Sequence, residues 1–181
     1  MILAISGTPG TGKTAVAKIL AKKLDANLIS IGNLVNTVKH TWDKSRRTRI
    51  VDVKDLQKAV NRHVVKKKIN IVEGHLAHLL NADKIIVLRC APNILEKRMQ
   101  KKRWQKEKIS ENIQAEILDE ITIEAIEKHG RKRVFEIDTS NKTAATTAVI
   151  MNKLLNNSGA KKYRTGRFDW SEKYKDYLLG R

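Results

Sequence analysis

The sequence has little cysteine, proline or glycine. One cysteine, Cys90, and two prolines occur among 181 residues, so an internal disulfide framework is excluded and a reducing compartment is the simplest assumption. Nine glycines and 41% apolar residues exclude a collagen-like chain and a disordered one. No apolar run approaches the ~20 residues of a membrane span, and the opening segment lacks the basic leader of a signal peptide. We therefore expect a cytoplasmic protein with a buried core and no membrane partner.

Acidic residues are scarce relative to basic ones. Lys and Arg number 37 against 19 Asp and Glu, which gives a formal net charge of +18. Such an excess attracts nucleotides, RNA and acidic protein surfaces without choosing among them. A lysine-rich composition is also typical of growth at high temperature, where ion-pair networks become more favourable. The length fits one compact domain, or one domain with small inserted flaps.

Short apolar runs alternate with segments of helical periodicity. The predicted strands are residues 2–6, 27–30, 69–72, 84–88 and 133–137. The first predicted helix spans Ala15 to Leu24. The others run from Asp52 to 66–68, from Pro92 into 101–104, from Ser110 to Gly130, and from about Thr143 to Leu155. Strands rich in branched residues that alternate with helices predict an α/β sandwich, in which helices cover both faces of a five-stranded parallel sheet. The polar stretch 39–49 shows no clear periodicity, and we expect it to fold over a site.

The strongest motif is Gly7-Thr-Pro-Gly-Thr-Gly-Lys-Thr14, which fits G-x-x-x-x-G-K-[ST] between a predicted strand and a predicted helix. In such a phosphate-binding loop (P-loop), glycines let the backbone wrap around phosphates, and the N–H groups of the helix start face the anion. Lys13 would reach the β- and γ-phosphates of ATP, and the Thr14 hydroxyl would ligate Mg²⁺. The residues expected to bind ATP here are Gly7, Thr8, Pro9, Gly10, Thr11, Gly12, Lys13 and Thr14.

A dinucleotide fingerprint is the rival interpretation of this loop, since Gly10, Gly12 and Ala15 match G-x-G-x-x-A. That fingerprint requires an acidic residue about 20 positions later, where residues 30–32 are Ser-Ile-Gly. The Asn/Thr-Lys-x-Asp guanine box of GTPases is missing, and large motor ATPases need a longer chain. A small P-loop protein with a polar segment after the second strand and a basic one after the fourth is typical of a nucleoside monophosphate (NMP) kinase.

Four segments, taken in order, resemble the adenylate kinase isoenzyme 6 family of adenylate kinase-like ATPases, which are associated with small ribosomal subunit maturation. They are the P-loop, Ile29-Ser-Ile-Gly-Asn-Leu34, Ile71-Val-Glu-Gly-His75 and Asn112-Ile-Gln-Ala-Glu-Ile117. The match spans about residues 1–155, and the chain looks archaeal in style. The resemblance implies reversible phosphoryl transfer between ATP and AMP, Mg²⁺-dependent ATP hydrolysis, and a partnership with ribosomal protein uS11 and small-subunit rRNA.

The resemblance also implies an organisation of the chain. Residues 1–157 would form a P-loop kinase-like domain. Within it, residues 31–68 would make an NMP-binding flap and residues 99–112 a lid. Residues 158–181 lie beyond the match, and their own composition indicates a basic aromatic C-terminal tail.

Individual roles follow from the same resemblance. Glu73 stands where the family usually has aspartate, so it would hold Mg²⁺ with Thr14 or, being one methylene longer, orient a metal-bound or attacking water. Arg98 resembles the arginine that meets the ATP base, and Lys102 stands where adenylate kinases often place a second arginine. The predicted catalytic residues are Lys13, Glu73, His75, Arg98 and Lys102.

The acceptor site is less defined. In the segment that corresponds to Ile29–Leu34, the family tends to show aspartate after the glycine and arginine a few residues later. Here Asn33 follows Gly32. Positive charge could come from the polar loop instead, and the expected acceptor residues are Gly32, Asn33, Arg46, Arg47 and Arg49. On the ATP side, Asn141 lies where adenylate kinases contact adenine mainly through the backbone.

Two alternatives stay open for the function. One is an ATPase assembly switch that binds rRNA or a ribosomal protein, with incidental kinase activity; the other is a cytidylate or other small-molecule kinase. The tail bears on the first, because residues 158–181 hold five of the eight aromatic residues and seven Lys or Arg. Trp170, Tyr174 and Tyr177 would share one side of a helix, where they suit RNA stacking or capture of a partner, or cover the chain's own core.

Overall fold

The computed structural model describes residues 1–43, 48–156 and 158–179. Its centre is a five-stranded sheet in the order β2-β5-β1-β6-β7, in which every neighbouring pair is parallel. The strands are β1 (Ile2–Ser6), β2 (Asn27–Ser30), β5 (Asn70–Glu73), β6 (Lys84–Arg89) and β7 (Val134–Asp138). The predicted α/β architecture is confirmed.

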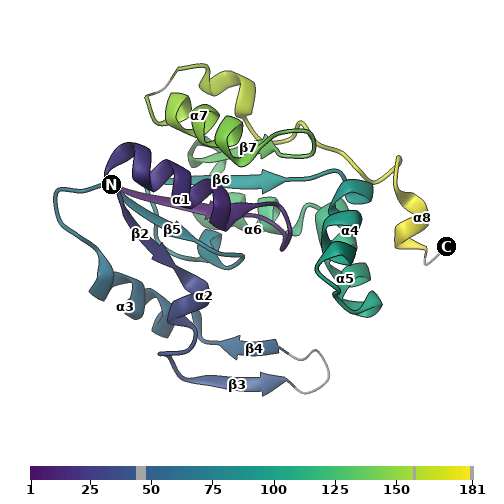
Figure 1. Cartoon of the computed structure of the whole chain (residues 1–181), viewed down its shortest axis with the longest axis horizontal. Helices are drawn as coiled ribbons and strands as arrows, with labels where there is room; N and C mark the ends of the chain where they lie inside the picture. Colours follow the sequence, from purple (N-terminus) through teal and green to yellow (C-terminus); the bar gives the residue numbers. More distant parts are fainter. Residues whose placement is uncertain (44–47, 157, 180–181) are drawn as a thin grey trace.

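Helices cover both faces of this sheet (Figure 1). α1 (Lys13–Leu24) and α7 (Ala144–Leu155) pack on one face, where Leu3 and Ile5 of β1 point. α3 (Val53–His63) and α6 (Glu120–His129) cover the other face, where Ala4 points. Successive side chains of a strand alternate between faces, so the apolar runs of the sequence build two cores at once. Among the described residues, none of the helices has the length and apolar character needed to cross a membrane.

Two flaps extend from the carboxyl ends of the strands (Figure 1). After β2, the short α2 (Ile31–Leu34) leads into an antiparallel hairpin of β3 (His40–Asp43) and β4 (Thr48–Val51). After β6, α4 (Pro92–Lys101) and α5 (Lys106–Ile117) form a helical hairpin. The predicted lid, residues 99–112, therefore spans the end of α4, a turn and the first half of α5.

The polar stretch 39–49, which showed no clear periodicity, overlaps β3 and β4, and these strands pair with each other. Two local predictions were wrong. The helix expected from Asp52 to 66–68 does begin at the Asp52 cap, which accepts from the N–H groups of Lys54 and Asp55, but it ends at His63. The single helix expected from Ser110 to Gly130 is two helices, because Asp119 adopts a left-handed conformation (φ 57°) between α5 and α6. Its carboxylate is bonded to Arg89.

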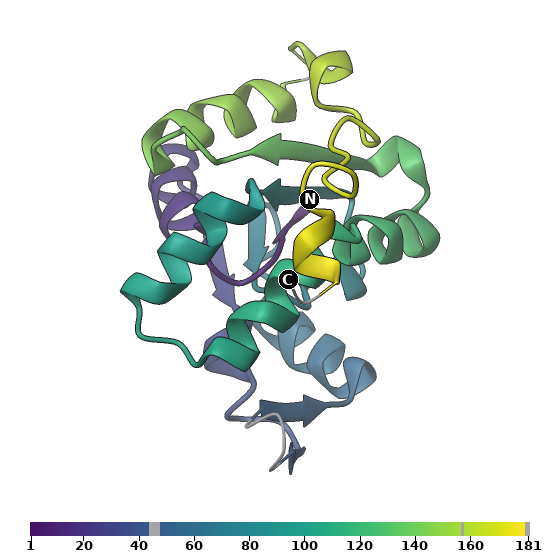
Figure 2. The same cartoon turned by 90° about the vertical axis from the view of Figure 1, so that its right-hand side faces the viewer.

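The tail runs from α7 past β7 to the α4–α5 hairpin, where α8 (Lys175–Leu178) lies (Figure 2). Arg164 forms a β-bridge with Phe135 of β7. Trp170, Tyr174 and Tyr177 pack against the apolar cluster of α4 and α5. The aromatic side chains of the tail thus contribute to the chain's own core, which favours that alternative over a free stacking surface.

Candidate active site

The P-loop curls against β6 and depends on its glycines. Gly7, Gly10 and Gly12 have φ of +134°, +94° and +96°, conformations that residues with a Cβ rarely adopt. A Cβ at Gly7 would lie 2.3 Å from the carbonyl oxygen of Leu88, so only glycine lets the loop approach the strand this closely. The loop ends where α1 begins at Lys13, and the unpaired N–H groups of a helix start make an anion site.

Side chains of the loop hold its shape from within. Lys13 Nζ donates hydrogen bonds to the carbonyl oxygens of Gly7 at 2.7 Å and Thr8 at 3.1 Å. The Thr11 hydroxyl also donates to the Thr8 carbonyl, at 2.8 Å. The Lys13 ammonium therefore lies inside the curl of the backbone, where a phosphate chain could replace the carbonyls as its partner.

The surroundings of Lys13 change its protonation. Burial lowers the pKa of this ammonium to about 8, and the positive charge of Lys102 acts in the same direction, while the carboxylates of Glu73 and Glu116 oppose the shift. Lys102 follows the last residue of α4, and together with Gly12 and Thr14 it lines a cavity of about 420 Å³ at the P-loop. The structure thus brings together Lys13 and Lys102, two predicted catalytic residues that lie far apart in the sequence.

A hydroxyl and a carboxylate face each other beside this cavity. Thr14 Oγ1 donates to Glu73 Oε2 at 3.0 Å, and Ser30 Oγ donates to Glu73 Oε1 at 2.5 Å. Glu73 ends β5 and is 4% exposed. Mg²⁺ prefers oxygen ligands and is usually bound through one or two protein groups plus substrate phosphates, so Thr14 and Glu73 fit such an ion. Ser30 was missed from the sequence, although it ends the strand next to Glu73 and pairs with it in register.

His75 lies in the turn after Glu73. Gly74 between them has φ +154°, and a Cβ there would come within 2.7 Å of Ile31 Cβ, so the turn packs directly on α2. Partial burial of the ring, and then the positive charge of Lys13, lower the pKa of His75 to about 4. The imidazole is therefore neutral at pH 7 and close to the P-loop lysine.

Arg98 of α4 lies beside the P-loop, next to Thr11. Its guanidinium donates to the carbonyl oxygens of Thr139 at 2.7 Å and Ser140 at 3.2 Å. Together with Thr11 and Lys142 it lines a second cavity of about 220 Å³. Asn141 is exposed next to these residues. This cavity adjoins the phosphate loop and has the backbone of residues 139–140 beside it, as a base-binding site would.

The residues expected to bind the acceptor are only partly placed. Gly32 and Asn33 are exposed on α2, the helix that packs on the turn after Glu73. Arg49 lies in β4 at the register position opposite Trp42. Arg46 and Arg47 fall outside the described residues. Residues of the hairpin and of the start of α3 line a cavity of about 830 Å³.

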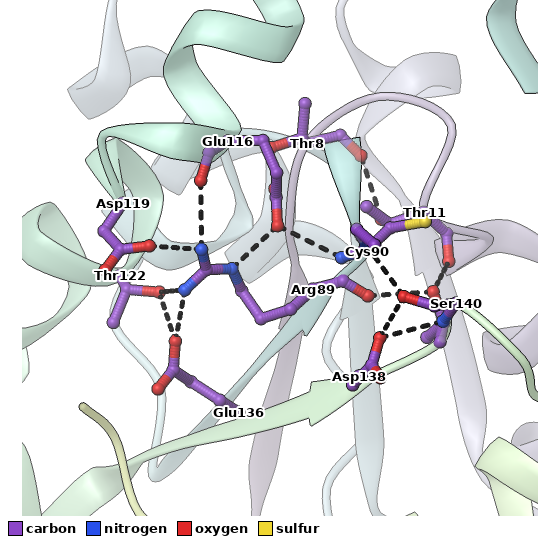
Figure 3. A network of polar contacts seen from close by, with 12 residues as sticks. Thr8, Thr11, Arg89, Cys90, Glu116, Asp119, Thr122, Glu136, Asp138 and Ser140 are labelled. Carbon is purple, nitrogen blue, oxygen red and sulfur yellow. Dashed lines mark hydrogen bonds and ion pairs between the residues drawn. The ribbon is translucent and has the colours of Figure 1, made fainter. Parts of the chain in front are cut away.

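A buried cluster around Arg89 was missed in the sequence (Figure 3). Arg89 ends β6, is 1% exposed and forms ion pairs with Glu116, Asp119 and Glu136. Burial alone would lower the pKa of Arg89, but these carboxylates reverse the direction and raise it. The signal in the sequence is a single arginine closing an apolar strand, together with glutamates among the apolar residues of α5 and β7.

Comparison with known proteins gives consistent matches. The AAA domain family matches residues 3–119. A protein of Methanocaldococcus jannaschii named "Putative adenylate kinase" is 39% identical over 180 residues, which are 98% of this chain and 97% of that protein. A protein of Thermococcus kodakarensis with the same name is 36% identical over 180 residues, with the same 98% and 97% coverage.

Solved structures of two kinases share the fold. Shikimate kinase from Acinetobacter baumannii superposes with a TM-score of 0.63 at 14% identity, covering 86% of this chain and 93% of that one. Thymidylate kinase from Candida albicans gives a TM-score of 0.56 at 13% identity, covering 86% and 91%. At these identities the likeness concerns the fold, which is that of the small P-loop kinases.

Proposed function

The chain belongs to the AAA domain family and to the family of these archaeal relatives, and from that premise we propose that it is an ATP-dependent NMP kinase, specifically an adenylate kinase that converts ATP and AMP to two ADP. The observation that carries the proposal is the meeting of four groups around one P-loop. Lys13 and Lys102 line the same cavity, and Thr14 faces Glu73 across 3.0 Å.

The charges of the site suit phosphoryl transfer. Negative charge spreads over the oxygens of the transferred group, and fixed cations in a site shielded from water stabilise it. Lys13 supplies such a cation from the P-loop and Lys102 from the lid. Thr14 and Glu73 would hold Mg²⁺, which when bound neutralises phosphate charge. Lysine at position 102 offers a point charge without the planar fork of arginine, so it aligns the phosphates less strictly.

The two substrates would enter from different flaps. Arg98 and the backbone at Thr139 would receive the adenine of ATP. AMP would lie toward α2, where Gly32 and Asn33 are exposed next to the turn that carries Glu73, with cations of the polar loop at its phosphate. The resemblance to adenylate kinases and the names of the archaeal relatives support AMP over CMP as acceptor.

The product of a single incubation tests the reaction. With ATP and Mg²⁺, we expect ADP to form rapidly when AMP is added and slowly with CMP or dCMP. A preference for CMP would identify a cytidylate kinase instead. The Lys13→Ala variant should lower turnover by ~10²-fold or more, as expected for loss of a positioned transition-state donor. Lys22→Ala, which removes an exposed lysine at the end of α1, is the matched control; equal activity of both variants would refute the assignment.

A slower ATP hydrolysis without AMP is the second proposed activity. Glu73 would orient the attacking water, and the neutral His75 beside it could accept a hydrogen bond from that water. Phosphate released without AMP, and lost in Glu73→Gln, would support it. If ADP forms only with AMP, the ATPase proposal fails.

A link to small ribosomal subunit assembly is also proposed, with ribosomal protein uS11 and small-subunit rRNA as partners. It is supported by the segment resemblance and by the net charge of +18. Binding of the full chain to small-subunit rRNA should weaken steeply with salt, since released counterions drive such contacts. Binding that is absent at low salt would remove the RNA proposal, and a separate titration with uS11 tests the protein partner.

A further inference from the structure

Thr8 has a central place in the P-loop. Its carbonyl oxygen receives hydrogen bonds from Lys13 Nζ, from the Thr11 hydroxyl and, at 3.2 Å, from the Thr11 backbone N–H. Its hydroxyl leaves the loop and donates to Glu116 Oε2 at 2.5 Å. Residue 8 is thus bonded on one side to the groups that shape the loop and on the other side to a carboxylate outside it.

That carboxylate is itself held firmly. Glu116 is 2% exposed, and its Oε1 accepts from Arg89 Nε at 2.8 Å and from the Cys90 backbone N–H at 3.1 Å. Burial raises the pKa of Glu116, while the positive charge of Arg89 and the hydrogen bonds from Thr8, Arg89 and Cys90 oppose that shift. Three donors point at its two oxygens, and donors of this kind stabilise the ionised form of a carboxylate. Arg89 in turn is bonded to Glu136 of β7 and to the backbone carbonyl of Glu116. Figure 3 shows the continuous path from Thr8 through Glu116 to this guanidinium.

We propose that Glu116 is a positioning residue of the nucleotide site, which holds the P-loop in its phosphate-binding shape through the hydroxyl of Thr8. A hydrogen bond to a charged acceptor is stronger than one between neutral groups. A loop that is already shaped loses less conformational freedom when nucleotide binds, so more of the contact energy appears as affinity. The proposal rests on the proposed function only in assuming that this loop binds ATP.

The position of Glu116 gives the interaction a second consequence. Glu116 lies at the end of α5, and the lid residues 106–112 lie at the start of the same helix. One rigid helix therefore joins the P-loop contact to the lid. The loop and the lid keep a fixed relation on this side of the site as long as the Thr8–Glu116 bond is made.

Two threonines that contact the cluster allow a matched test. Thr122 donates to Glu136 at 3.1 Å and accepts from Arg89 at 3.4 Å, and Figure 3 shows it on the side of Arg89 away from Thr8. Thr8→Val and Thr122→Val each remove one hydroxyl from the cluster, but only Thr8→Val cuts the connection to the loop. We would measure Kd for ATP by calorimetry in the full chain without AMP, and amide hydrogen exchange of residues 8–12 without nucleotide.

Thr8→Val should weaken ATP binding by ~10-fold or more, the scale for losing a hydrogen bond to a charged group, while Thr122→Val should change it less than ~2-fold. Exchange at residues 8–12 should be faster in Thr8→Val only. Thr8→Ser keeps the hydroxyl and should restore both measurements. If Thr8→Val does not fold, Thr8→Cys, which replaces the hydroxyl with a weak donor, is judged by the same criterion.

Three results would overturn the proposal: equal Kd values for the two valine variants, unchanged exchange in Thr8→Val, or a serine variant as weak as the valine one. If the wild-type chain binds no ATP, the proposed function falls as well. If wild type binds ATP and all variants bind equally, the function stands and only the role of Glu116 is refuted.

Discussion

The lowered pKa of Lys13 predicts how the reaction depends on pH. The phosphate-binding form of this side chain is the ammonium, and its pKa in the nucleotide-free protein is about 8. Since kcat/KM reports the free enzyme, kcat/KM for ATP should be level near pH 7 and fall as pH rises through 8. Between pH 7 and 9 the protonated fraction drops from ~90% to ~10%, so the fall should approach ~10-fold.

The value of kcat should respond differently. Bound phosphates place negative charge next to the ammonium and raise its pKa, so kcat measured at saturating ATP should begin to fall at a higher pH than kcat/KM. His75, with a pKa of about 4, stays neutral across this range and adds no step of its own.

Initial rates of ADP formation over pH 6–10 would measure both profiles: kcat/KM with ATP varied and AMP kept well below its KM, and kcat with both nucleotides saturating. In Lys13→Arg, the guanidinium does not lose its proton in this range, so the activity should be lower but the step near pH 8 should disappear. A wild-type profile of kcat/KM that stays level to pH 9.5, or an unchanged step in Lys13→Arg, would refute the argument that this lysine titrates.

Two further predictions concern the metal site and the buried cluster. Glu73→Gln keeps the size of the side chain and removes the charge facing Thr14, so Mg²⁺-dependent turnover should fall by ~10²-fold. Calorimetry without Mg²⁺ should show nearly wild-type ATP binding. Equal losses in turnover with Mg²⁺ and in ATP binding without Mg²⁺ would argue against a role of Glu73 at the metal. Arg89→Met leaves three carboxylates without their cation, so the free energy of unfolding should drop by about 3–5 kcal/mol. Urea titrations would measure this change. A loss below about 1 kcal/mol would show that the charges do not hold the cluster together.

The parallel core and the P-loop could be predicted because their signals are local. Branched apolar runs mark the buried strands, and the glycine motif fits only a strand-to-helix turn. The β3–β4 hairpin gave no such signal, since its strands have four residues each, mix polar with apolar side chains and pair with each other.

Other parts of the site depend on residues far apart in the chain. The helical period of the sequence continues through Asp119, whose carboxylate bonds Arg89 of β6 at the turn between α5 and α6. The partnership of Ser30 with Glu73 likewise follows from sheet order, which places β2 next to β5. A single sequence shows which side chains are available at these positions but not which of them meet.

The docking of α8 on the helical hairpin also bears on biosynthesis. Tyr174 and Tyr177 each bond a residue 81 positions earlier, Asn93 and Glu96 in α4. At roughly 5–20 residues added per second, the growing polypeptide waits roughly 4–16 s between making the two partners. During that interval the side of α4 and α5 that later receives the tail faces water, where a chaperone could shield it. The α4–α5 hairpin is thus finished after the sheet that carries it.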